Sequence, residues 1–164
     1  MSELRTNRIV PRDGLPSGSS GGIIQVKMGV TTTQSTTTSG NFDATNLEVT
    51  ITPTRSDSKI FLMVSGGMNG PATSSGYNQI GYKIYRSVGG ASFAETESSS
   101  TGQAVFFGSA NEYNPLSINF LDSPSTTSSI TYKLYQKRIS GSSTASVNRN
   151  SDNQTQIIAM EVCG

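Results

Sequence analysis

The sequence predicts an all-β fold, an antiparallel β-sandwich or jelly roll with an extended N-terminal arm. Apolar and polar residues alternate in short stretches, turn residues recur about every 8–12 residues, and helical periodicity of useful length is missing. Many short strands with such spacing are typical of these folds. The alternation persists to the C-terminus, which argues against the alternative of a partly disordered low-complexity chain.

The clearest strand pair lies in the first half of the chain. Leu47, Val49 and Ile51 alternate with polar residues, which predicts a half-buried strand that Pro53 ends. The following run, residues 60–64, is apolar on both faces and must therefore be covered on both. A second sheet is one cover, and a neighbouring subunit could be the other.

The remaining strands follow from the same alternation. The Gly89-Gly90 pair is typical of a hairpin turn. We expect loops at residues 31–40, with the option of a polar strand end, and at 66–76 and 111–115. We expect further strands, about eight to ten in all, at residues 24–28, 78–88, 91–97, 103–107, 116–121, 129–139, 144–148 and 156–162.

Residues 1–22 differ from the body that follows, residues 23–164. Their apolar residues are spaced too irregularly for a helix face, and residues 17–22, SGSSGG, have the composition of a flexible linker. One hypothesis is a disordered tail. The other is an attachment arm that becomes ordered on a partner. The residues that would make this attachment are Leu4, Arg5, Arg8, Ile9, Val10, Arg12 and Leu15.

Composition favours self-association. Hydrophobic residues make up only 33% of the chain, and a core this thin is marginal without partners. Because residues 60–64 and 156–162 are both apolar on two faces, we predict a homotrimer with closed symmetry.

The net charge and the length of the apolar runs argue against nucleic acid and membranes as partners. The net charge of +1 gives no field that attracts nucleic acid or a membrane. No apolar run approaches the ~20 residues of a membrane span, and the N-terminal segment lacks the apolar core of a signal peptide. We therefore expect synthesis in a cytoplasm, without membrane insertion or export by the usual route.

The residue types present argue against an enzyme, a metal site and a cofactor. The chain has no histidine and one cysteine, Cys163, which excludes histidine-based catalytic triads and thiolate zinc clusters. Glu95 and Glu97 could form a glycosidase pair, but we interpret them as an exposed strand edge. Residues 148–154, NRNSDNQ, contain one carboxylate, so we interpret them as a polar turn rather than a calcium loop.

Tyrosines are the candidates for a sugar site, because their rings can stack on pyranose faces. Tyr82 and Tyr85 fall within an expected strand, where packing on a sheet face is the simpler interpretation. Tyr77 and Tyr113 fall in expected loops and are the better candidates for glycan contact.

Four stretches of the chain carry a family resemblance: LRTNRIVPRDG in the arm, GGIIQV after the linker, LEVTITPTRSDSKIFLMVSG, and the final IIAMEV. With these the chain resembles small virion structural proteins of tailed phages, especially fibre and decoration proteins of marine cyanophages. The resemblance implies a β-sandwich, commonly a trimer, that is anchored at the virion surface through its N-terminal arm. It therefore implies a non-enzymatic capsid decoration protein, head fibre or short tail-fibre-like knob. The alternative is the carbohydrate-binding receptor-recognition tip of a tail fibre. The partners implied are further copies of the chain, other capsid or tail proteins, and a host surface glycan.

Overall fold

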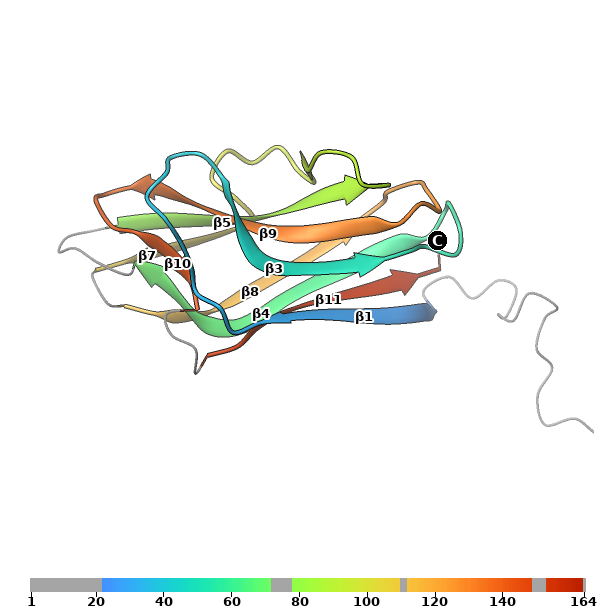
Figure 1. Ribbon diagram of the computed structural model, residues 1–164, viewed down its shortest axis with the longest axis horizontal. Coiled ribbons are helices and arrows are strands. Elements are labelled where there is room, and N and C mark those ends of the chain that lie inside the picture. Colours follow the sequence, from blue (N-terminus) through green and yellow to red (C-terminus); the bar gives the residue numbers. More distant parts are fainter. Residues whose placement is uncertain (1–21, 72–77, 110–111, 149–152, 164) are drawn as a thin grey trace, which may run out of the picture.

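A computed structural model of the chain describes residues 22–71, 78–109, 112–148 and 153–163. These residues form eleven β-strands and no helix. The strands make two antiparallel sheets that lie face to face (Figure 1). The all-β, antiparallel class expected from the alternation is confirmed.

The first sheet, which we call the β4 sheet, has the order β1-β11-β4-β10-β2, and β8 pairs with β4 on its other edge. Its strands are β1 (Ile23–Thr31), β2 (Ser35–Thr37), β4 (Lys59–Pro71), β8 (Asn114–Asp122), β10 (Ala145–Val147) and β11 (Thr155–Val162).

The second sheet, which we call the β5 sheet, has the order β3-β9-β5-β6, and β7 also pairs with β5. Its strands are β3 (Asp43–Ile51), β5 (Asn78–Val88), β6 (Ala94–Glu95), β7 (Ala104–Gly108) and β9 (Ile130–Ser140). Most of the expected strands are present, with ends that differ by a few residues.

The core lies between the sheets and is built from alternate residues of the main strands, as the period-two pattern requires. Tyr82 is fully buried in it and donates a hydrogen bond from its hydroxyl to the Ser146 carbonyl, at 2.5 Å. The buried apolar residues are Leu47, Val49, Ile51, Ile60, Leu62, Val64, Ile80, Tyr82, Ile84, Leu116, Ile118, Ile130, Tyr132, Leu134, Ala145, Val147, Ile157 and Ala159.

A buried polar cluster also joins the two sheets. The Arg86 guanidinium of β5 lies 2.5 and 2.7 Å from the two carboxylate oxygens of Asp122, at the end of β8. The Tyr132 hydroxyl of β9 donates to the same carboxylate at 2.7 Å. Asp122 is only 5% exposed, whereas the Arg86 side chain is 30% exposed. The cluster therefore connects the two sheets through an acceptor that is largely shielded from water.

The expected loop at residues 66–76 is partly wrong, because β4 continues to Pro71. Gly66 and Gly67 adopt positive φ angles of 93° and 70°, and the pairing with β8 shifts register between Gly66 and Asn69. Glycine allows this bend at low cost. The strand can therefore turn from β11 toward β10 although its residues do not alternate.

The expected strand at residues 91–97 is also shorter than predicted, since only Ala94 and Glu95 pair with β5. The chain then runs over the outer face of the β5 sheet. There the Thr101 carbonyl comes so close to Gly81 that a Cβ at Gly81 would lie 2.0 Å from it.

The described chain begins and ends at the same end of the sandwich, toward the right of Figure 1. The Cys163 amide donates to the Gly22 carbonyl at 2.9 Å, which closes the pairing of β1 with β11. The proposed attachment residues, Leu4 through Leu15, lie outside the described residues.

Candidate functional site: the outer faces of the two sheets

The outer face of the β4 sheet is apolar across four neighbouring strands. Residues that pair across β1, β11, β4 and β8 form rows on this face, because paired residues in an antiparallel sheet point to the same side. Two of these rows are mostly hydrophobic, and the third is mostly polar. The first row is Val26, Met160, Phe61 and Leu121, the second is Met28, Ile158, Met63 and Asn119, and the third is Val30, Gln156, Ser65 and Ser117.

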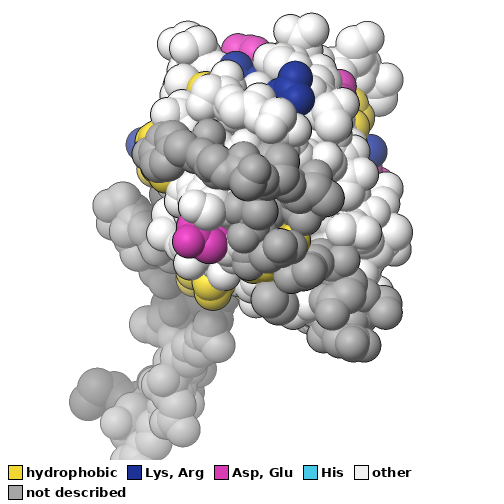
Figure 2. Space-filling view, turned by 90° about the vertical axis from the view of Figure 1, so that its left-hand side faces the viewer, with side chains coloured by type: hydrophobic (Ala, Val, Ile, Leu, Met, Phe, Trp, Pro, Cys, Tyr) yellow, Lys and Arg dark blue, Asp and Glu magenta, His cyan; other side chains and the backbone are white. Residues whose placement is uncertain are grey.

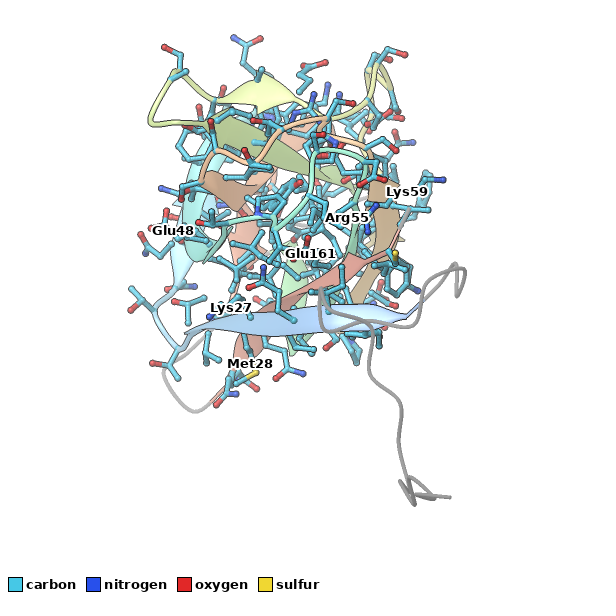
Figure 3. The ribbon with its side chains drawn as sticks, turned by 90° about the vertical axis from the view of Figure 1, so that its right-hand side faces the viewer. Lys27, Met28, Glu48, Arg55, Lys59 and Glu161 are labelled. Carbon is cyan, nitrogen blue, oxygen red and sulfur yellow. The ribbon has the colours of Figure 1, made fainter. Side chains whose placement is uncertain are left out.

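We call the eight hydrophobic side chains of these rows the outer apolar face. Several are well exposed for their size, with Met28 at 61% and Val26 at 54%. Met28 points away from the sandwich, whereas the neighbouring Lys27 points to the other side of β1 (Figure 3). The three rows contain no ionisable residue. A continuous uncharged hydrophobic face of this kind is typical of an interaction surface.

The expectation from the sequence that residues 60–64 and 156–162 have two apolar faces is confirmed. Ile60, Leu62 and Val64 point into the core, and Phe61 and Met63 lie on the outer face, half-exposed. In β11 the inward side chains are Ile157 and Ala159, and the outward ones are Ile158 and Met160. The outward side chains of both strands are therefore left partly exposed at the surface of the single chain.

The end of the sandwich nearest the start of β1 contains a buried carboxylate, Glu161 (Figure 3). It accepts hydrogen bonds from the Gln25 amide at 2.6 Å and from the backbone amide and hydroxyl of Thr54 at 2.7 and 2.8 Å. Burial by itself would raise the pKa of Glu161. The hydrogen bonds from Gln25 and Thr54, together with the nearby Ser58 hydroxyl, lower the pKa by more than burial raises it. The pKa of Glu161 therefore lies below its ordinary value.

The opposite end of the sandwich differs. In the view onto that end, the described atoms in sight are mostly neutral polar groups, and hydrophobic side chains form only small separate patches (Figure 2). The described atoms that are in sight at this end therefore show no large hydrophobic patch.

The outer face of the β5 sheet has a different character, because aromatic rings lie there among charged side chains. Phe42 and Tyr85 have ring centroids 6.0 Å apart, Tyr85 stacks on Tyr135 at 4.1 Å, and Tyr135 lies 6.0 Å from Phe93. Tyr85 and Tyr135 come from the neighbouring strands β5 and β9. All four rings are half-buried, so they form a partly exposed aromatic row across this face.

Lysine side chains lie against this row. The Lys83 and Lys137 ammonium groups are 5.0 and 4.7 Å from the centroid of the Phe42 ring, and Lys133 is 5.2 Å from that of Phe93. These are cation–π distances. Lys133 also forms an ion pair with Glu48 at 2.6 Å.

Lys83 is a buried cation, 1% exposed, and its partners explain how it is tolerated. Its ammonium lies 3.2 Å from Glu95 Oε2, 3.2 Å from the Glu97 carbonyl and 3.4 Å from Glu97 Oε1. The two carboxylates that the sequence suggested as a catalytic pair therefore both face the Lys83 ammonium.

A hydrogen bond from the Tyr85 hydroxyl to Glu95 Oε1, at 2.9 Å, holds the same carboxylate from its other side. This bond and the one from Lys83 lower the pKa of Glu95 below its ordinary value. Burial and the neighbouring Glu95 charge raise the pKa of Tyr85. Glu95 is therefore an oriented carboxylate and Tyr85 a neutral hydrogen-bond donor.

A hollow of ≈ 470 Å³ opens on this face, beside the aromatic row. We call it the β5-face hollow. Its lining combines two aromatic rings with polar side chains: Gly40, Asn41, Phe42, Tyr85, Glu95, Ser98, Ser99, Ser100 and Lys137.

The sequence missed this hollow. Alternation placed Lys83 and Tyr85 on one strand face, and Lys133 and Tyr135 on another, but it gave no pairing between the strands. In the structure Lys83 stands opposite Tyr135, and Tyr85 opposite Lys133. Phe42 and the 98–100 segment come from loops whose course the sequence did not indicate.

The two tyrosines proposed for glycan contact are not brought to this hollow. Tyr113 is half-buried directly before β8, in the other sheet, and Tyr77 lies outside the described residues. The expected polar turn at residues 148–154 is described only in part, so its interpretation stays a prediction.

Two further features bear on function. The described part of the chain contains no helix with the length and apolar character needed to span a bilayer. Within the same residues, no three acidic, histidine or cysteine side chains gather where they could hold a metal ion. Comparison of the chain with models of protein families and with curated proteins finds no match.

Proposed function

We propose that this chain is a non-enzymatic structural subunit of a phage virion, a homotrimeric surface appendage anchored by residues 1–22. The observation that carries the proposal is the outer apolar face. Its hydrophobic side chains are already partly buried, and an interface would add the remaining part of the roughly 1.5–3 kcal/mol that full burial of each contributes. The proposed partner is a further copy of the same chain, which carries the same apolar face. An assembly with closed symmetry stops at a fixed number of subunits.

The strand order supports a jelly roll. The eight longest strands fall into two sets of four neighbours, β1-β11-β4-β8 and β3-β9-β5-β7. Two four-stranded sheets with the chain passing back and forth between them are typical of jelly rolls, an architecture found in viral capsid proteins and lectins. Together with the resemblance of the N-terminal arm and the strands to phage fibre and decoration proteins, this favours a virion protein.

The trimer is tested by light scattering and analytical ultracentrifugation of the full chain at micromolar concentration. We expect a trimer for the natural chain and a folded monomer for Met63→Lys, because an unpaired charge cannot be buried among apolar side chains. Thr50→Lys is the matched control, since Thr50 is exposed on the outer face of the other sheet, and it should stay trimeric. A stable monomer of the natural chain, or a trimer of Met63→Lys, would contradict the proposal.

Placement on the particle needs a separate measurement. The number of copies per purified virion distinguishes a capsid decoration protein, present in many copies, from a tail protein, present in few. A protein that is absent from purified particles would contradict the virion assignment itself.

A second candidate function is recognition of a host surface glycan. The observation that favours it is the aromatic row on the outer face of the β5 sheet. The two sheets form separate layers (Figure 1), so the outer face of one is on the opposite side of the sandwich from the outer face of the other. A trimer that buries the outer face of the β4 sheet would leave this row accessible. Binding of the full chain to an array of host-type glycans tests it.

A further inference from the structure

We propose that the β5-face hollow binds one neutral saccharide unit, with Phe42 and Tyr85 as its apolar wall and Glu95 as its hydroxyl acceptor. The inference rests on the second candidate function, glycan recognition, and assigns to it a site and a ligand class. It does not depend on the trimer or on the virion.

The size and lining of the hollow fit a small polyhydroxylated ligand. Its volume of ≈ 470 Å³ falls within the roughly 300–1,000 Å³ of small-molecule sites. Two rings supply apolar surface, and most of the remaining lining is polar: the amide of Asn41 and the hydroxyls of residues 98–100. A sugar presents the complementary pair of surfaces, a face of C–H groups and a rim of hydroxyls.

The charges of the hollow favour a neutral ligand. The Lys83 ammonium, next to the hollow, is already surrounded by the Glu95 and Glu97 carboxylates. Lys137 donates to the Ser100 carbonyl and faces the Phe42 ring. The two ammonium groups and the two carboxylates leave this part of the surface without net charge, which favours neither an anion nor a cation.

Glu95 is a preorganised acceptor. Tyr85 holds one of its oxygens and Lys83 the other, at 2.9 and 3.2 Å, and its side chain is 50% exposed. A carboxylate offers about four acceptor positions, so both oxygens retain capacity for a ligand. Two oxygens fixed side by side suit two adjacent sugar hydroxyls, and little side-chain freedom is lost on binding.

The rings of the aromatic wall contact one another and Tyr135. Tyr85 stacks with one ring face on Tyr135, and a ring has two faces. Phe42 lies tilted at 56° to Tyr85, so the two rings meet the hollow at different angles. The site therefore combines an apolar corner with a carboxylate that two hydrogen bonds orient.

The test is saturation-transfer NMR of the full chain with the methyl glycosides of glucose, galactose, mannose and N-acetylglucosamine as probes. We expect transfer to at least one probe. Glu95→Gln should weaken its binding about tenfold, the loss of one charge-assisted hydrogen bond, and Phe42→Ala should abolish the signal. Thr131→Ala, on the same sheet face but outside the lining, is the matched control and should bind like the natural chain. Circular dichroism of each variant shows that it is folded.

The other outcomes separate the site from the function. Binding that survives both Glu95→Gln and Phe42→Ala but is lost in Tyr113→Ala overturns the β5-face hollow and keeps glycan recognition. The absence of transfer to every probe overturns this site. If the glycan array is also negative, glycan recognition itself is overturned. Displacement of a bound probe by inorganic phosphate would show an anion site and contradict the neutral ligand.

Discussion

Gly29 shows how closely β1 approaches the β5 sheet. A Cβ at this position would lie 1.8 Å from the backbone carbonyl oxygen of Glu48, in β3. No side-chain rotation relieves a contact with backbone, so the two strands would have to separate. We predict that Gly29→Ala lowers the free energy of unfolding by about 1–3 kcal/mol or more, measured by urea denaturation.

The control for this substitution is Gly40→Ala, because a Cβ at Gly40 meets nothing within 4 Å. Its stability should stay close to that of the natural chain. If Gly29→Ala is equally stable, β1 does not pack against β3 as closely as described.

Glu161 makes stability depend on pH. Its pKa in the folded protein lies below the ordinary value of 4.5, so the unfolded chain binds the proton more readily. Its contribution to stability is therefore fully present well above pH 4.5 and is lost as the pH falls toward the lowered pKa. We predict that the natural chain is more stable than Glu161→Gln near neutral pH and that this difference shrinks as the pH falls through that range.

Urea denaturation of both proteins at a series of pH values measures this difference. Glu48→Gln serves as the comparison, since the Glu48 side chain is half-exposed and pairs with Lys133 at the surface, where ion pairs contribute little. A difference between the natural chain and Glu161→Gln that does not change with pH would refute the role of the buried carboxylate.

At the scale of elements, the two sheets depend on Asp122 for their polar connection. Asp122→Ala leaves the Arg86 guanidinium and the Tyr132 hydroxyl without this acceptor. We predict a loss of about 1.5–3 kcal/mol in the free energy of unfolding, measured by thermal and urea denaturation. Asp57→Ala removes an exposed ion pair with Arg55 and should change stability little. Equal effects of the two substitutions would contradict the role assigned to Asp122.

The strands and their faces could largely be predicted from the sequence, because alternation is a local property. The predictions for residues 60–64 and 156–162 held for this reason. The path of β4 beyond Gly66 could not be predicted, because its glycines are typical of a loop. This part of the strand is stabilised by pairing with β8 and β10, which are distant in the sequence. The β5-face hollow could not be predicted either, since it depends on the register of β5 with β9 and on the course of the 96–103 segment.

At the scale of the molecule, the sandwich has two outer faces of opposite character. The outer apolar face is hydrophobic and uncharged, whereas the face with the β5-face hollow is aromatic, charged and hydrogen-bonding. An assembly that buries the first presents the second outward. The two proposed roles, self-association and glycan recognition, would therefore use different surfaces of one subunit.

Residues 1–22 are proposed as the attachment arm. Fixing a segment of this length on a partner costs about 1–2 kcal/mol per residue. Under the proposal one arm would therefore bind weakly, and three arms on one trimer would bind by avidity. We predict that a chain starting at Gly22 folds and forms trimers but does not join particles, measured by co-sedimentation with virions that lack the protein. Incorporation equal to that of the full chain would show that the arm is only a tail.

The pairing of Gly22 with Cys163 has a consequence for the order of folding. β11 lies between β1 and β4, and β1 pairs with no other strand among the described residues. A nascent chain therefore holds β1 unpaired until the last strand of the body has been made, and such long-range pairing is slow. The rows of the outer apolar face also become complete only when β11 has been made, because β11 contributes the second residue of each row. A chain that is still being synthesised thus lacks part of the outer apolar face, the surface that we propose for association.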